Sequence, residues 1–234
     1  MTSTVREIVL DTETTGLNPL AGDRIVEIGC VELVNHIPTG RHFHRYVNPE
    51  RAMPEDAFRV HGLSDAFLSD KPRYAEIIAE FAEFIGDATL IIHNAPFDMG
   101  FLNAEHTRLR HPELKNPVID TVMLARTVHP GARVSLDSLC KHYGIDNSHR
   151  TLHGALLDSE ILAEVYLELI GGRQVGLAFI GEVDRTETRV AVRVPARPRP
   201  VPLPSRVDAA TLEAHRALLA TLGNEPLWHY YEAA

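Results

Sequence analysis

The chain has 234 residues, a formal net charge of −9, 44% hydrophobic residues and 24% charged residues. That length is enough for one well-buried domain plus an appendage, and the composition is ordinary for a soluble globular protein. No apolar run approaches the roughly 18 residues of a membrane span, and the first residues lack the basic start and apolar core of a signal peptide. Cys30 and Cys140 favour a reducing cytosol over a disulfide scaffold, and they lack the spacing of a zinc site.

Three strands are predicted near the start of the chain. Residues 8–10 form a short apolar run, residues 24–34 partly alternate and are rich in β-branched side chains, and residues 41–47 alternate. Because only short gaps separate these runs, we expect an antiparallel meander.

Helices and strands are then predicted to alternate. The expected elements are a short helix and turn over residues 54–63, an amphipathic helix from Pro72 to Gly86, a strand at 89–93, a helix from Pro96, a strand at 118–120, helices at 122–127 and 135–143, and a last helix that ends at Gly171 and Gly172. Strands that first meander and then alternate with helices indicate an α/β domain, with a mixed sheet flanked by helices.

The composition changes in the last quarter of the chain. Residues 183–206 are rich in proline and arginine, so we expect an extended, flexible linker there. Beyond it, Asp208 is predicted to cap a short helix that Gly223 ends. One helix with an exposed Trp228 is too little to fold alone, so we expect it to dock on another protein; packing on its own domain is the alternative.

Asp11 and Glu13 follow the first predicted strand two residues apart. Side chains alternate across a strand, so both carboxylates project to the same side. Like charges at a buried strand repel each other and lose hydration, and a hard cation such as Mg²⁺ or Mn²⁺ relieves that strain. Taken alone, the pair is equally consistent with an acidic strand end in solvent.

Two further carboxylates lie on predicted apolar helix faces. Asp98 shares a face with Phe101, and Asp158 shares one with Ile161. An inward carboxylate is costly unless it meets a metal ion, hydrogen-bond donors or a basic side chain. A helix cap for Asp98 and a Lys or Arg partner for Asp158 therefore stay open as alternatives.

His153 precedes Asp158 by five residues, which is a rotation of about 140° on a helix. We therefore expect His153 at or before the helix start, where it is free to swing over the site. Imidazole titrates near neutral pH, which suits a general base that activates water. A surface histidine is the alternative.

Three segments carry a resemblance to a known family: Val-Leu-Asp-Thr-Glu-Thr-Thr-Gly-Leu at 9–17, Ile-His-Asn-Ala-Pro-Phe-Asp at 92–98, and Thr-Leu-His-Gly-Ala-Leu-Leu-Asp at 151–158. They resemble the three exonuclease motifs of the family named for four carboxylates and a histidine (DEDDh), and within it the proofreading subunits of bacterial replicative DNA polymerases. The similarity runs from residue 5 to about residue 180. The tail is similar in layout only.

The resemblance implies a ribonuclease-H-like fold with a five-stranded sheet and a 3′→5′ exodeoxyribonuclease that releases 5′-mononucleotides. Two divalent ions, Mg²⁺ or Mn²⁺, would be held by Asp11, Glu13, Asp98 and Asp158, and His153 would deprotonate the attacking water. Substrate contacts are implied for Asp11, Glu13, Thr14, Thr15, Leu17, Asp56, His61 and Asp158, with Leu17 as a wedge at the terminal base. Asp56 stands where relatives often have Glu.

The resemblance also implies partners for each part of the chain. Residues 1–180 would be the exonuclease domain, 181–206 the linker and 207–234 the segment that binds the catalytic (alpha) subunit of the polymerase. Residues 174–179 resemble the Gln-x-x-Leu-x-Phe pattern of peptides that bind the sliding clamp, and a strand at the domain edge is the alternative. The substrate is a DNA 3′ end, a small third subunit is left open, and no membrane is involved.

The acidic net charge bears on these partners, because domains that bind nucleic acid alone usually carry a basic surface. We therefore expect polymerase and clamp to hold the duplex for this chain. Two other functions remain: a free-standing exonuclease that trims 3′ ends, and an adaptor that bridges polymerase and clamp.

Overall fold

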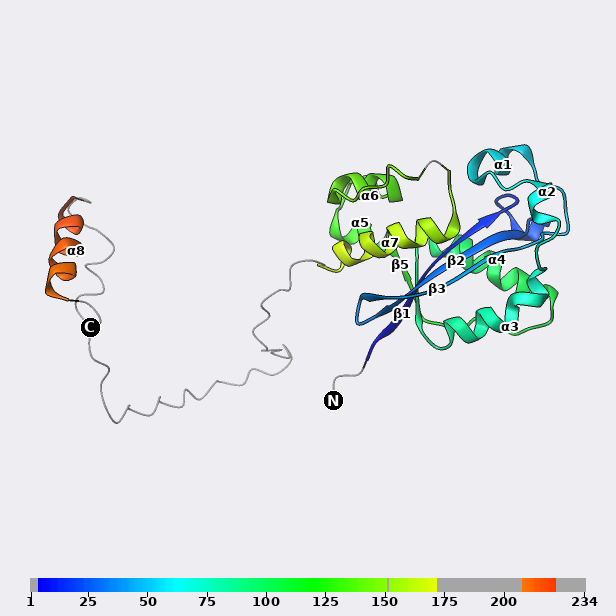
Figure 1. The fold of residues 1–234 in the computed structure, drawn as a ribbon, viewed down its shortest axis with the longest axis horizontal. Coiled ribbons are helices and arrows are strands. Elements are labelled where there is room, and N and C mark those ends of the chain that lie inside the picture. The colour runs from blue at the N-terminus through cyan, green and yellow to red at the C-terminus, as the bar shows by residue number, and fades with distance from the viewer. Residues whose placement is uncertain (1–3, 151, 172–207, 222–234) are drawn as a thin grey trace. The chain divides into compact units, whose positions relative to one another are not determined.

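A computed structural model of the chain describes residues 4–150, 152–171 and 208–221, which fall into two units, residues 1–180 and 181–234 (Figure 1). The sheet of the first unit has the order β3-β2-β1-β4-β5. Its strands are β1 (Arg6–Thr14), β2 (Ile25–Val34), β3 (Ile37–Tyr46), β4 (Thr89–Ile92) and β5 (Val118–Asp120). The first three pair antiparallel, and β4 and β5 extend the sheet in parallel from β1, so the predicted mixed sheet is confirmed.

The helices of this unit follow the predicted order with two additions. They are η1 (Pro19–Ala21), α1 (Glu55–His61), α2 (Asp65–Leu68), α3 (Tyr74–Ile85), α4 (Ala95–Arg108), α5 (Thr121–Val128), α6 (Leu136–Tyr143) and α7 (Ala155–Leu169). The sequence did not predict η1 or α2, which are too short to show a helical period. Side-chain caps define both, since Asn18 accepts hydrogen bonds at the start of η1 and Ser64 at the start of α2.

The prediction for the third strand was wrong at its start. It placed the strand at residue 41, where apolar alternation begins, whereas β3 begins at Ile37 and pairs directly with Val34. A two-residue turn joins them, with Asn35 and His36 both at positive φ (50° and 65°). Such a turn matches the twist of paired strands, so pairing continues through residues that show no alternation.

The two faces of the sheet bury separate cores. Leu10 packs with Phe81 on the face that α3 and α4 cover. Val9, one residue earlier, packs with Leu162 on the face that α7 covers. The alternation along β1 therefore decides which helices each of its later side chains meets.

The first turn of α7 lies directly against β2. A Cβ atom on Gly29 would stand 2.2 Å from backbone atoms of Ala155 and Leu156, so only glycine permits this approach. The Ser159 hydroxyl donates to the Gly29 carbonyl at 3.0 Å. Gly29 pairs with Asp11 across the strands, so α7 begins beside Asp11.

The second unit contains α8 (Ala209–Thr221), where a helix was predicted. Asp208 Oδ1 accepts a hydrogen bond from the Thr211 amide at 2.7 Å, which is the expected cap. The proposed linker at 181–206, the peptide at 174–179 and the helix end at Gly223 lie outside the described residues. Within the described ranges, no helix combines the length and apolar character needed to cross a bilayer.

Candidate active site

Asp11 and Glu13 lie inside β1, which continues to Thr14, instead of following its end as predicted. Both are in step with Val9, so they project toward α7, as the shared-side prediction requires. Asp158 stands in the first turn of α7. The packing of α7 on the sheet thus brings the third carboxylate to the first two.

Asp98 reaches the site from the other face of the sheet. It lies in the first turn of α4, which follows β4, the parallel neighbour of β1. Its Oδ1 accepts hydrogen bonds from the Thr12 amide at 3.0 Å and from the Thr12 hydroxyl at 2.7 Å. Thr12 points toward α4 because it alternates with Asp11 and Glu13. Two donors, rather than a helix cap, therefore satisfy this carboxylate.

His153 stands just before α7, where it was predicted. Gly154 is the helix cap, and the His153 amide donates to the Val60 carbonyl at 3.1 Å. The imidazole is half-exposed, with Nδ1 3.1 Å from Asp158 Oδ2.

The side chains described above line one cavity of about 300 Å³. All five residues predicted for metal binding and catalysis line it: Asp11, Glu13, Asp98, His153 and Asp158. Ligand atoms of Glu13, His153 and Asp158 all lie within 4.8 Å of one another. Carboxylate oxygens with one imidazole form a donor set that suits a hard divalent cation, so the residues fit a metal site.

Burial and mutual repulsion weaken three of the acids. Burial raises the pKa of Glu13 to about 8, with further contributions from Asp158 and the cross-strand Glu27. Burial likewise raises the pKa of Asp98 to about 7, against the effect of the Thr12 hydrogen bonds. The pKa of Asp11 is raised well above its ordinary value by burial and by Asp98 and Glu13. The positive charge of Arg150 compensates only part of this repulsion for Asp11 and Glu13, and a divalent ion would supply more.

Arg150 was not predicted to be part of the site. Its Nε and Nη2 donate to Asp158 Oδ1 and Oδ2 at 2.6 and 2.7 Å, and the side chain also lines the cavity. Burial alone raises the pKa of Asp158, but the contacts with His153 and Arg150 outweigh burial and lower that pKa. Asp158 thus has the basic partner that the sequence left open as an alternative, and this partner lies in the cavity itself.

A second cavity, of about 560 Å³, borders the first and shares Thr12, Glu13 and Phe97 with it. Its lining includes the remaining residues predicted for substrate binding: Thr14, Thr15, Leu17, Asp56 and His61. Leu17 is 84% exposed, whereas Thr15 is buried. His61 is also buried, and its Nε2 makes no hydrogen bond of normal geometry with any described residue. The cavity therefore has an apolar edge at Leu17 and a buried imidazole in its wall.

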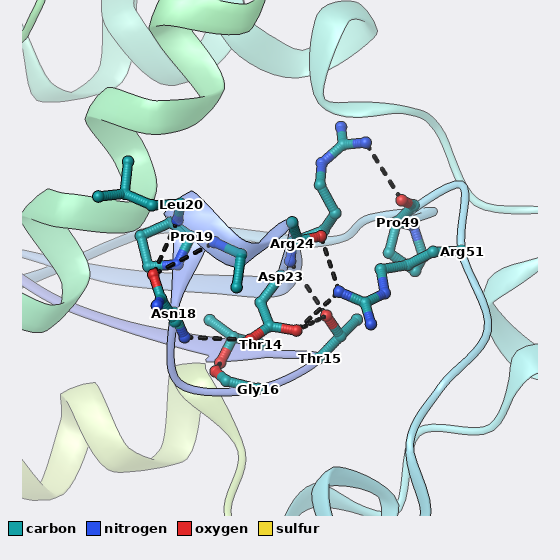
Figure 2. A network of polar contacts seen from close by, with 12 residues as sticks. Thr14, Thr15, Gly16, Asn18, Pro19, Leu20, Asp23, Arg24, Pro49 and Arg51 are labelled. Carbon is teal, nitrogen blue, oxygen red and sulfur yellow. Dashed lines mark hydrogen bonds and ion pairs between the residues drawn. The ribbon is translucent and has the colours of Figure 1, made fainter.

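Polar contacts fix the loop that carries Leu17 (Figure 2). Asp23 accepts hydrogen bonds from the Asn18 amide at 3.0 Å and from Arg51 at 2.7 Å, and the Thr15 hydroxyl accepts one from the Arg24 amide at 3.0 Å. A Cβ atom on Gly16 would lie 2.4 Å from the Asp23 carboxylate. Leu17 is thus exposed on a loop that these hydrogen bonds hold in place.

Comparisons with known proteins agree with this site. A family profile described as Exonuclease (RNase_T) matches residues 8–166. The DNA polymerase III subunit epsilon of Rickettsia felis is 47% identical over 224 residues, which is 94% of this chain and 98% of that protein. The chain belongs to the DNA polymerase III epsilon family of exonucleases.

Members of this family are 3′→5′ exonucleases that depend on divalent metal ions, and this chain is one of them. The epsilon subunit of Escherichia coli K12 is 44% identical, over 97% of this chain and 98% of that protein. Exonuclease X, solved in complex with 5′ overhanging duplex DNA, superposes with a TM-score of 0.58 at 27% identity and covers 70% of this chain and 91% of its own. The nuclease domain of 3′hExo, a DEDDh family member bound to rAMP, shares the fold with a TM-score of 0.64 at 18% identity, over 73% of this chain and 94% of its own. The predicted fold and enzyme class are confirmed.

Proposed function

We propose that this chain proofreads DNA synthesis by hydrolysing misincorporated nucleotides from the 3′ end within a bacterial DNA polymerase III. One observation carries the proposal: four carboxylates and a histidine from β1, α4 and the start of α7 converge on a single cavity. Curated relatives of nearly the same length bear the name DNA polymerase III subunit epsilon, which supports the polymerase assignment.

The metal site is assigned to Asp11, Glu13, Asp98 and Asp158, which would hold two divalent ions, Mg²⁺ or Mn²⁺. Bound there, such ions would polarise the phosphate and stabilise the charge that develops on the attacking and leaving oxygens. Asp98 is held in place for this role by Thr12, and the packing at Gly29 holds Asp158 next to Asp11.

His153 is assigned the proton transfer from the attacking water. Its half-exposed ring stands at the cavity edge before the rigid start of α7, so it has room to move toward a bound nucleotide. His153→Gln should lower kcat by about 10²- to 10⁴-fold, the usual contribution of a general base, and should remove the base-dependent limb of the pH profile. His149→Gln, in the same segment but exposed, is the matched control. Equal rates for both variants would contradict the assignment.

The second cavity is assigned to the 3′-terminal nucleotides. Leu17 presents an exposed apolar side chain that would pack against the terminal base, while Thr14, Thr15 and Asp56 line the wall. His61 forms part of the same wall. A frayed end enters such a groove more readily than a paired one, so we expect faster release from a mismatched 3′ end than from a matched end.

The C-terminal segment 207–234 is assigned to the alpha subunit of the polymerase, and residues 174–179 to the sliding clamp. In support, α8 exposes Leu212 and Leu218, apolar side chains that a partner would cover. The test compares the full chain with a chain that ends at residue 206 in binding to purified alpha subunit. Retained binding by the shortened chain would overturn the tail assignment and would favour a free-standing trimming enzyme.

A further inference from the structure

Arg150 contacts Asp158 and His153, at one end of the cavity, at the same time. Its Nη2 lies 2.6 Å from His153 Nδ1 and 2.7 Å from Asp158 Oδ2, while its Nε lies 2.6 Å from Asp158 Oδ1. The remaining nitrogen, Nη1, donates to Asp137 Oδ1 at 2.8 Å. The Arg150 side chain is only 9% exposed. One guanidinium thus contacts both oxygens of Asp158 and the inner nitrogen of the imidazole.

These contacts occupy the atoms that the proposed chemistry needs. A guanidinium only donates hydrogen bonds, so in this arrangement His153 Nδ1 is the acceptor and its lone pair is engaged. Both Asp158 oxygens receive charge-assisted bonds in a bidentate fork, the strongest common geometry for this pair. Ligand atoms of His153, Asp158 and Glu13, all within 4.8 Å of one another, form the group that could hold a cation.

We propose that Arg150 is an internal cation that holds the Asp158–His153 end of the site and that a divalent ion must displace it before catalysis. The inference rests on the proposed metal site and adds a competitor to it. A guanidinium and a divalent cation repel each other, and both take the same carboxylate oxygens, so each weakens the binding of the other. Displacement frees His153 Nδ1 in the same step.

The arrangement also explains how the site folds without excess negative charge. Arg150 is the one basic side chain among the residues that line this cavity, apart from its histidines. It offsets part of the repulsion between carboxylates that α4, α7 and β1 bring together. The exposed carboxylate of Asp137, at the rim, gives the displaced guanidinium a second partner and keeps it at the cavity mouth.

The test measures Mn²⁺ binding by the full chain in the absence of DNA, using calorimetry. Arg150→Gln should bind Mn²⁺ about tenfold more tightly than wild type at the weaker site, because the ion no longer displaces a charged hydrogen-bonded pair. Arg126→Gln is the charge-matched control, since Arg126 is exposed and contacts Met123 Sδ at 3.9 Å. Unchanged or weaker binding by Arg150→Gln would overturn the proposal.

A second measurement needs only the wild-type fold. The Arg150 Nε–H should give a slowly exchanging NMR signal in the metal-free protein, assigned by its loss in Arg150→Gln, and Mg²⁺ should abolish that protection. A signal that saturating Mg²⁺ leaves unchanged would refute displacement. Wild type that binds neither ion would defeat the metal site and this inference together, whereas normal binding with an unaffected Arg150 would defeat this inference alone.

Discussion

The four carboxylates of the cavity differ in their surroundings more than in their chemistry. Glu13 and Asp98 are buried and Asp11 is partly buried beside like charges, and the pKa values of all three are raised. Asp158 is also buried, but its contacts with His153 and Arg150 lower its pKa. In the metal-free protein, part of the negative charge of the site is therefore neutralised by protons and part by a guanidinium.

These raised pKa values predict that the metal-free protein loses stability as the pH rises. Glu13 has an ordinary pKa of 4.5 and a folded value of about 8, so between these pH values the folded state binds more protons than the unfolded chain. The stabilisation is complete below the unfolded pKa and is lost through the folded pKa. In urea unfolding with a chelator, the free energy of unfolding should fall from pH 5 to pH 8, and Glu13→Gln should flatten that fall. The exposed Glu113→Gln should not; equal slopes for both variants would contradict the prediction.

At the residue scale, the sequence predicted the four carboxylates of the cavity but not the arginine that contacts one of them. Asp11, Glu13, Asp98 and Asp158 were predictable because each sits at a fixed phase of a strand or an apolar helix face. His153 was predictable because its distance from Asp158 placed it before the helix. Arg150 lies in an irregular segment between α6 and α7, where no period fixes the direction of a side chain. The signal that could have found it was the open requirement for a basic partner to Asp158.

At the scale of elements, the site depends on how closely α7 approaches the sheet. Gly29→Ala should lower the free energy of unfolding by about 1–3 kcal/mol or more, because its Cβ would meet the α7 backbone, which cannot give way. The matched control is Gly100→Ala in α4, where nothing lies within 4 Å, and that change should be neutral or stabilising by about 0.5–1 kcal/mol. Chemical unfolding measures both variants. Similar stabilities for the two would show that the approach at Gly29 does not govern packing.

The hydrogen-bonded loop that carries Leu17, before β2, leads to a prediction about paired and single-stranded substrates. Asp23→Asn weakens the contacts with Arg51 and with the Asn18 amide, so Leu17 should be less firmly held (Figure 2). Excision from paired 3′ ends should fall several-fold, while excision from single-stranded DNA should change little. Kinetics on both substrates, alongside Leu17→Ala, measure the effect. Equal losses on the two substrates would indicate a general folding defect instead.

The long elements were predictable because each repeats its pattern of apolar residues over many positions. Helices α3, α4 and α7 and strand β2 present apolar faces that the sequence displays directly. The start of β3 and the whole of α2 depend instead on local backbone preferences, a turn at positive φ and a Ser64 cap, which leave only short signals. The same limit applies to η1, whose cap at Asn18 shapes the loop of Leu17.

At the scale of the whole molecule, the residues that line the carboxylate cavity all lie in the first unit. All five residues assigned to metal binding and catalysis belong to the first unit, and the second contributes α8 with exposed leucines. The net charge of −9 argues that the chain relies on partners to hold the duplex. This division fits a proofreader that acts on ends delivered to it.

The most direct test is nucleotide release from a 5′-labelled primer with a 3′ mismatch, measured with Mg²⁺ and with chelator for wild type, Asp11→Asn and Asp70→Asn. Asp11 lines the cavity, and Asp70 is an exposed carboxylate outside it. Stepwise shortening from the 3′ end should require Mg²⁺, persist in Asp70→Asn and fall by orders of magnitude in Asp11→Asn. Nucleotide release that continues with chelator present, or that Asp11→Asn leaves unchanged, would contradict the assignment of the carboxylate cavity as the active site.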